Sequence, residues 1–326
     1  MGTAYESPFV NKTRAYRIVL LGMCVLGGTV LSPAQIAMSA IGYMPTAPAA
    51  IAPGQLITAK VGLNLPAGTA SLLPLPLSIK GTSAILYGEA GLDVGQTFNL
   101  PLLSVSVDFV YIGRIISWNL ATVTVQIPYE IKPASATNYG LYELGVASDS
   151  NPSAIIRMVA QADAIHILRT GDSIETPVYG LHPVIGPFPP VITHVNGTTV
   201  TMDHPTRPGE TVLMWAVGLG APSSGTVKTG EANPSPALTT TVNIDFDFRS
   251  NAGPSMPSAT DTGGSRVPAK QVTAYFAPGF VGLYQINVTI PAPPVPLEPC
   301  GGIYQSNLTI NIGGSASFDG VGICVE

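Results

Sequence analysis

Two short motifs recur in the same order in both halves of this 326-residue chain, and this repetition constrains the fold more than any other feature. The first motif is a Pro-Gly turn, a short apolar segment and a Gly-Leu exit, found at 52–66 and at 207–222. The second is an alternating segment ended by proline, found at 124–128 and at 287–291. A repeat of this length marks tandem domains and not the turns of a solenoid. The chain is therefore predicted to contain two related units.

The composition favours an all-β fold for both units. Only 10% of the residues are charged, against about 25% in an ordinary globular protein, and there are 35 glycines and 31 prolines. Thr- and Val-rich segments are separated by turn residues, and few segments show a helical apolar period. We expect two tandem immunoglobulin-like β-sandwich domains, at 44–170 and 186–326, joined by a linker at 171–185.

Residues 241–249 show the clearest strand alternation. Asp245 and Asp247 fall on the same side, where two carboxylates would lie about 6–7 Å apart, a separation that some glycosidases use. The alternative, which we expect, is the solvated face of an amphipathic strand, with Arg249 beside them. This pattern predicts a buried face of Val242, Ile244, Phe246 and Phe248 and a solvated face of Asn243, Asp245, Asp247 and Arg249.

The first 40 residues differ in kind from the rest. Lys12, Arg14 and Arg17 precede an uncharged, almost wholly apolar run at 18–31, and small residues follow as far as residue 40. This order is typical of a secretory signal peptide, so 1–40 is predicted to direct export to the cell surface or beyond. The alternative is a signal anchor that is never cleaved, since uncharged residues continue to Ile41 and lengthen the apolar run towards a membrane span.

The chain contains 3 cysteines. Cys24 lies in the signal segment and leaves with it if that segment is cleaved. Cys300 and Cys324 then remain as an even pair in an oxidising compartment, and a disulfide between them is expected. It would pin the last strand to the segment before it and stabilise the fold by about 3 kcal/mol. The alternative is a pair of free buried thiols.

One long segment, FAPGFVGLYQINVTIP at 276–291, has a specific pattern. With 208–220 and 307–315 it resembles the signature of a large family of uncharacterised secreted proteins, the Solibacter-type C-terminal domain of acidobacteria. The resemblance covers most of the second unit well and the first unit more loosely. It implies tandem Ig-like sandwiches of the kind found in surface proteins. It implies no catalytic or binding residue, because none is established for the family.

The histidines predict no metal site. His166 is expected to be an ordinary strand residue, at the surface or hydrogen-bonded. His182, His194 and His204 lie in a turn-rich region, and no two of them have the spacing of zinc ligands. The sequence also lacks a nucleophile elbow, a phosphate loop, a dinucleotide glycine pattern and an EF-hand loop. We therefore expect no catalytic residue, cofactor or metal.

Trp118 and Trp215 are the candidate ligand-contact residues, one in each unit. Exposed aromatic rings serve as stacking platforms in sugar-binding modules, but two non-equivalent strand positions suit core packing or contact between units better. The rings of Tyr275 and Tyr284 are expected to cover the core with their hydroxyl groups outward.

These expectations point to a function based on surfaces. The net charge of −5 and the lack of a basic stripe exclude nucleic acid as a partner. The first hypothesis is a secreted or cell-surface, non-enzymatic protein for adhesion, extracellular matrix or protein–protein contact, whose partner is an unidentified extracellular protein or glycan. The second is a carbohydrate-binding module, and the third a small extracellular hydrolase. Membrane contact is expected only through an uncleaved signal segment.

Overall fold

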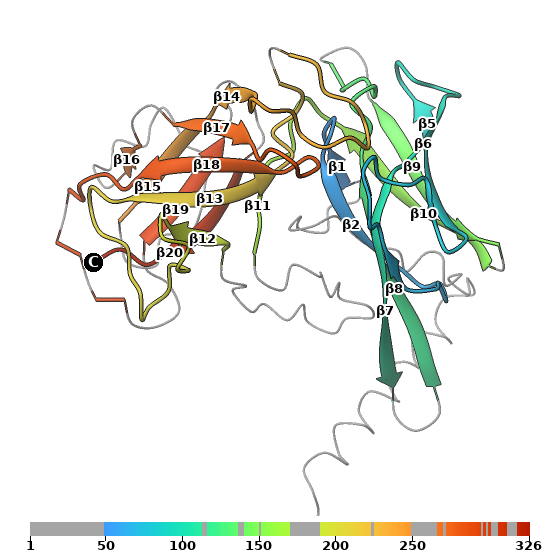
Figure 1. Ribbon diagram of the computed structural model, residues 1–326, viewed down its shortest axis with the longest axis horizontal. Helices are drawn as coiled ribbons and strands as arrows, with labels where there is room; N and C mark the ends of the chain where they lie inside the picture. The colour runs from blue at the N-terminus through green and yellow to red at the C-terminus, as the bar shows by residue number, and fades with distance from the viewer. Residues whose placement is uncertain are drawn as a thin grey trace, which may run out of the picture.

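The computed structural model describes most of the chain from residue 49 onward (Figure 1). Every regular element among the described residues is a β-strand, which confirms the all-β prediction, and none of these residues forms a helix suited to crossing a membrane. The predicted signal segment at 1–40 and the predicted linker at 171–185 lie outside the described residues, as do Cys24, His182 and Arg249. The described residues are 49–112, 116–135, 140–149, 151–169, 190–222, 225–248, 266–269, 272–294, 296–297, 299–300, 306–311 and 318–326.

The first unit is a pair of sheets packed across an apolar core. One sheet has the order β1-β10-β9-β5-β4, with β6 on β5, and the other has the order β2-β8-β7-β3. Leu86, Val123 and Leu144 are fully buried in the core between them. The strands are β1 (Ala49–Ile51), β2 (Leu56–Val61), β3 (Gly68–Thr69), β4 (Ser78–Ile79), β5 (Thr82–Ala90), β6 (Thr97–Asn99), β7 (Leu102–Ile112), β8 (Ile116–Gln126), β9 (Leu141–Ser148) and β10 (Asn151–Ala160).

The second unit repeats this plan. One sheet has the order β11-β13-β18-β17-β14, with β12 on β13, and the other has the order β16-β15-β19-β20. Met214, Phe246 and Ile286 are fully buried between the two sheets. The strands are β11 (His166–Ile167), β12 (Ile192–His194), β13 (Thr211–Val217), β14 (Thr239–Thr241), β15 (Asn243–Asp247), β16 (Arg266–Pro268), β17 (Thr273–Phe276), β18 (Tyr284–Thr289), β19 (Ser306–Asn311) and β20 (Phe318–Ile323).

The two repeated motifs form the same strand pair in each unit. In the first unit, β2 pairs with β8 and places Leu56 opposite Gln126. In the second unit, β13 pairs with β18 and places Thr211 opposite Thr289. Leu56 and Thr211 each follow the turn glycine by two residues, and Gln126 and Thr289 each precede the motif proline by two residues. The sequence repeat is therefore also a repeat of strand register.

The Pro-Gly turns repeat their hydrogen bonds as well. Gly54 N donates to Ile127 O at 3.0 Å, and Gly209 N donates to Ile290 O at 2.8 Å. Both glycines have a positive φ, 76° and 86°, which residues with a Cβ atom adopt only at a cost in energy. The turn conformation explains why glycine recurs at this position.

The second packing unit begins earlier than its predicted boundary. β11 pairs with β13, and Ile165 packs in the second core, whereas Ala160 packs in the first. The change from one core to the other thus falls between residues 160 and 165, before the predicted end of the first unit at 170.

Backbone and amide groups connect the two units. Gly230 N donates to Gln126 Oε1 at 2.6 Å, and Gly230 O accepts from Leu75 N at 2.7 Å. The Gln126 amide also donates to Gly54 O at 3.3 Å, so it holds the turn of its own unit as well. Because Gln126 is 1% exposed, a lost bond would leave a polar atom without water to replace it.

Tyr129 and Thr229 extend this contact. Thr229 Oγ1 accepts from Tyr129 N at 3.0 Å and donates to Glu130 Oε2 at 2.6 Å. Tyr129 belongs to the first unit by sequence, but its ring packs against the second core. The two sandwiches are therefore joined by a packed, hydrogen-bonded interface.

Candidate functional site

The outer face of the β13-β18-β17 sheet carries two aromatic and two amide side chains on neighbouring strands. Val212, Met214 and Ala216 of β13 point into the core, so the residues between them point away from it. Trp215 is paired with Gln285 of β18, which is paired in turn with Tyr275 of β17. The next row joins Leu213, Asn287 and Thr273. These residues form what we call the Trp215 face: Leu213, Trp215, Thr273, Tyr275, Gln285 and Asn287.

Core packing, one of the two structural roles expected for Trp215, is wrong. The indole is half-buried on the Trp215 face, and Tyr275 on the same face is 37% exposed. The physical reason is the period of two along a strand, which puts Trp215 on the side opposite Met214. Trp118 lies on β8 opposite Val110, and its side chain is outside the described part of the structure.

Tyr284 also differs from its expected position. Its ring is 3% exposed and stacks on Phe276 with centroids 4.2 Å apart. The hydroxyl points inward and donates to Gly220 O at 2.8 Å. Burial raises the pKa of Tyr284 well above its ordinary value of 10.0. The hydroxyl is therefore an internal structural donor and is not directed outward.

Asp245 and Asp247 do not form an open carboxylate pair. Asp247 is 4% exposed and Asp245 is half-buried, so the prediction of a solvated face is wrong for Asp247. β15 lies inside its sheet, with β16 on one side and β19 on the other, and such a strand is covered by its neighbours. Both carboxylates interact with other groups of the protein. This burial removes the separation argument for a glycosidase-like pair.

The Cys300–Cys324 disulfide is present as predicted, with Cα atoms 5.7 Å apart. Cys324 O accepts from Thr206 N at 3.1 Å, and Cys300 N donates to Glu326 Oε1 at 2.8 Å. The bond therefore fastens the C-terminal segment beside Thr206. Cys300, Cys324 and Glu326 are close enough together to hold a metal ion, but sulfurs joined in a disulfide offer no thiolate ligand.

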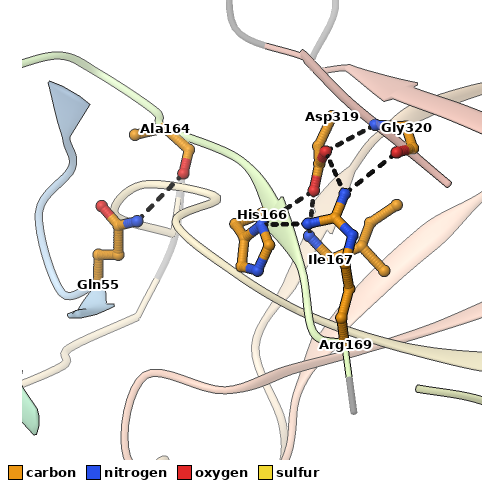
Figure 2. A network of polar contacts seen from close by, with 7 residues as sticks. All are labelled: Gln55, Ala164, His166, Ile167, Arg169, Asp319 and Gly320. Atoms are coloured by element: carbon orange, nitrogen blue, oxygen red, sulfur yellow. Dashed lines mark hydrogen bonds and ion pairs between the residues drawn. The ribbon is translucent and has the colours of Figure 1, made fainter. Parts of the chain in front are cut away.

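His166 belongs to a buried cluster near the start of the second unit (Figure 2). Its Nδ1 lies 3.0 Å from Asp319 Oδ2 and 3.1 Å from Arg169 Nη1. Arg169 Nη2 donates to Asp319 Oδ1 at 2.7 Å and to Gly320 O at 3.1 Å. Asp319 Oδ2 also accepts from Ile167 N at 2.8 Å, so this carboxylate ties β11 to β20.

The electrostatics of this cluster favour a fixed carboxylate. Burial works to raise the pKa of Asp319, but the hydrogen bond with His166 and the positive charge of Arg169 outweigh it and hold the pKa below 3.8. A His–Asp pair is the base of many hydrolases. Here, however, His166 is 1% exposed, so a substrate has no access to its ring. The cluster therefore has a structural role, which is to hold β11 against β20.

His194 forms a second pair with a carboxylate. Its Nδ1 bonds to Glu210 Oε1, and its Nε2 lies 3.2 Å from His204 O. Both partners are acceptors, so both ring nitrogens must donate, and only the protonated imidazolium does so. The hydrogen bond to Glu210 accordingly raises the pKa of His194 above 6.5.

Glu210 is the turn residue that follows Gly209. Glu210 Oε2 accepts from Arg207 N at 3.0 Å and from Thr206 Oγ1 at 3.0 Å. Burial works to raise the pKa of Glu210, but the hydrogen bonds from His194 and Thr206 lower it below 4.5. In the first unit, Gln55 stands at the equivalent position and accepts from Ala52 N at 2.8 Å. The repeated turn thus uses an amide in one unit and an ion pair in the other.

Sequence reasoning missed Gln285, Asn287, Glu210 and Asp319. Gln285 and Asn287 stand at alternating positions of the segment 284–289, so their outward direction was readable from the strand period. Glu210 follows a Pro-Gly turn that is visible in the sequence. Asp319 has no such signal, because only the tertiary fold brings it to His166 across 153 residues of numbering (319 − 166 = 153).

No protein-family model matches the chain, and no curated protein matches it significantly. The resemblance to the Solibacter-type family remains a prediction. The structure itself shows an all-β protein with two packed β-sheet cores.

Proposed function

We propose that the chain is an exported, non-enzymatic binding protein that presents the outer faces of two joined β-sandwiches to an extracellular partner. The observation that carries this proposal is the Trp215 face, where aromatic and amide side chains lie on the side of the sheet that points away from the core. On a sheet face that only contacts water, charged side chains would keep the protein more soluble than aromatic ones. Exposed Trp and Tyr side chains are typical of contact surfaces.

The interface between the units supports a presenting role. Because Gln126, Gly230 and Thr229 join the sandwiches by hydrogen bonds, the two units offer their faces in one fixed arrangement. The Cys300–Cys324 disulfide and the signal-like segment 1–40 favour an oxidising, extracytoplasmic location. The family resemblance of 276–291 to secreted surface proteins points the same way.

A hydrolytic role has less support. His166 is buried against Asp319, His194 is committed to Glu210 and His204 O, and Asp247 is buried. Each of these groups would have to leave its internal partner before it could act on a substrate. Binding through the outer faces needs no such change.

The experiment is a cell-surface test in the producing organism. The full chain carrying a C-terminal tag is followed by protease accessibility on intact cells and by alkylation of free thiols. We expect an accessible protein with Cys300 and Cys324 protected as a disulfide. Purified protein comprising residues 41–326 should then bind intact cells saturably. A protected, reduced protein inside the cell, or the lack of saturable binding to cells, would contradict the proposal.

A further inference from the structure

The Trp215 face has the geometry of a platform for a sugar chain. Trp215 and Tyr275 flank Gln285 on neighbouring strands, in direct register. The two aromatic residues are therefore separated by two interstrand spacings, about 9.5 Å. This is about the length of a disaccharide, so the two rings can each stack against a sugar ring of one chain. In Figure 1, β13, β18 and β17 lie next to one another along this row.

The polar groups between the rings suit sugar hydroxyls. Gln285 Nε2 donates to Asn287 Oδ1 at 2.9 Å, which orients both amides on the surface. Asn287 is exposed and Gln285 is half-buried. Within the described part of the chain this is the one side-chain hydrogen bond that either amide makes, which leaves Gln285 Oε1 as an acceptor and Asn287 Nδ2 as a donor. Vicinal sugar hydroxyls each offer a donor and an acceptor, and amides match both.

The charge of the face decides between ligand classes. None of the six residues of the Trp215 face is charged, and their neighbours along and across the strands include the threonines Thr193, Thr211, Thr239, Thr241 and Thr289. An anionic ligand would need Arg or Lys to offset its desolvation. A purely apolar partner would leave the amides unpaired. A neutral sugar presents C–H faces to aromatic rings and hydroxyls to amides.

We propose that the Trp215 face binds a neutral oligosaccharide or polysaccharide, with Trp215 and Tyr275 stacking on sugar rings and Gln285 and Asn287 bonding to hydroxyls. This assignment rests on the proposed binding function and names its ligand class. Tyr87 of the first unit serves as the control position, because it is also an exposed aromatic residue, 41% exposed on β5, but pairs across the strand with the charged Glu143. That surface lacks the uncharged rows of the Trp215 face.

Native affinity electrophoresis tests the assignment. Purified protein comprising residues 41–326 is run through gels containing mixed-linkage β-glucan, glucomannan, arabinoxylan or dextran, with polygalacturonate and heparin as anionic controls. We expect retardation in at least one neutral gel. Trp215→Ala and Tyr275→Ala should each weaken it about tenfold, as expected for one lost aromatic contact, while Tyr87→Ala keeps it. Circular dichroism and Tm verify that each variant is folded.

Fluorescence gives a second readout at the site itself. In Trp118→Phe protein, Trp215 is the remaining tryptophan of the 2 in the chain, and the retarding polysaccharide should shift its emission. Retardation in no neutral gel, retardation only by the anionic polymers, or full binding by Trp215→Ala would overturn the assignment. If the wild type still binds cells and Trp215→Ala binds equally well, the sugar site fails and the proposed function stands. If the wild type binds neither cells nor polysaccharide, both fail.

Discussion

His166 and His194 are both held by carboxylates, but the two pairs differ in their access to solvent. His166 is 1% exposed beside Asp319 at 14%, whereas His194 is 15% exposed beside Glu210 at 31%. The first pair is one part of a larger buried cluster with Arg169. The second pair lies beside the turn at Gly209, where both side chains are partly exposed to solvent.

The His194–Glu210 pair should make stability depend on pH. The pKa of His194 is raised, so its contribution is fully present below 6.5 and is lost as the pH rises through its folded value. The pKa of Glu210 is lowered, so its contribution is present above 4.5 and is lost in acid. Between these values the pair should contribute about 1 kcal/mol. Thermal unfolding of His194→Gln at pH 5.5 and 8.5 measures this.

The wild type should lose its advantage over His194→Gln between pH 5.5 and 8.5. His204→Gln serves as the control, because His204 contributes its backbone groups to this network and its side chain is exposed. An equal difference between wild type and His194→Gln at both pH values would show that the pair carries no charge.

Asp319 should be far more costly to remove than an exposed carboxylate. Asp319→Ala leaves Arg169 and His166 without their shared partner in a buried setting, with an expected loss of about 3 kcal/mol of unfolding free energy. Glu231→Ala removes an exposed pair with Lys228 and should change stability by less than about 0.5 kcal/mol. Urea unfolding of both variants provides the comparison. Similar losses would mean that the cluster does not fasten β11 to β20.

At the scale of single residues, the sequence predicts local features and fails on tertiary ones. The disulfide partners Cys300 and Cys324 follow from counting and compartment. The burial of Asp247 does not, because it depends on which strands flank β15. The inward hydroxyl of Tyr284 depends on where Gly220 lies. The outward direction of Trp215 follows from the strand period alone, because it alternates with the buried Met214.

At the scale of elements, the repeated turn offers an internal comparison. Gly54 and Gly209 occupy equivalent positions and both have a positive φ. A Cβ atom at Gly54 would collide with the ring of Tyr129, whereas a Cβ atom at Gly209 meets open space. The turn in the first unit therefore also serves the interface between the units.

Alanine at these two glycines should separate strain from collision. Gly209→Ala should cost about 1–2 kcal/mol from the backbone conformation. Gly54→Ala carries the same strain and also displaces Tyr129, so its cost should be larger by at least about 1 kcal/mol. Chemical unfolding of the two variants gives both values. If the two losses are equal, Tyr129 does not pack against the turn.

The strand order was not readable from the sequence, even where the strands were. The motifs at 52–66 and 124–128 predict strands, and they are β2 and the end of β8. The sequence does not show that β2 pairs with β8, or that β13 pairs with β18 in the same register, because strand pairing depends on the tertiary fold. β11 shows the limit most clearly, because it precedes the predicted boundary in sequence but pairs with β13 of the second unit.

At the scale of the whole molecule, we infer that the two equivalent sandwiches form one rigid body. Gln126, Tyr129, Thr229 and Gly230 join the units, and loss of the three hydrogen bonds made by the Gln126 and Thr229 side chains across the interface should free the units to move. A fixed arrangement lets both outer faces contact one extended partner at once. Two units on a flexible tether would have no preferred distance between them.

The most direct measurement is the distance between spin labels on the two units. Thr97→Cys on β6 and Met202→Cys in the second unit are both exposed positions for labels, and double electron–electron resonance reports their distance distribution. We expect one narrow distribution for the otherwise wild-type chain, and a broad one once Gln126→Ala and Thr229→Ala are added. A distribution in the wild-type background that is already broad, or that has several maxima, would contradict it.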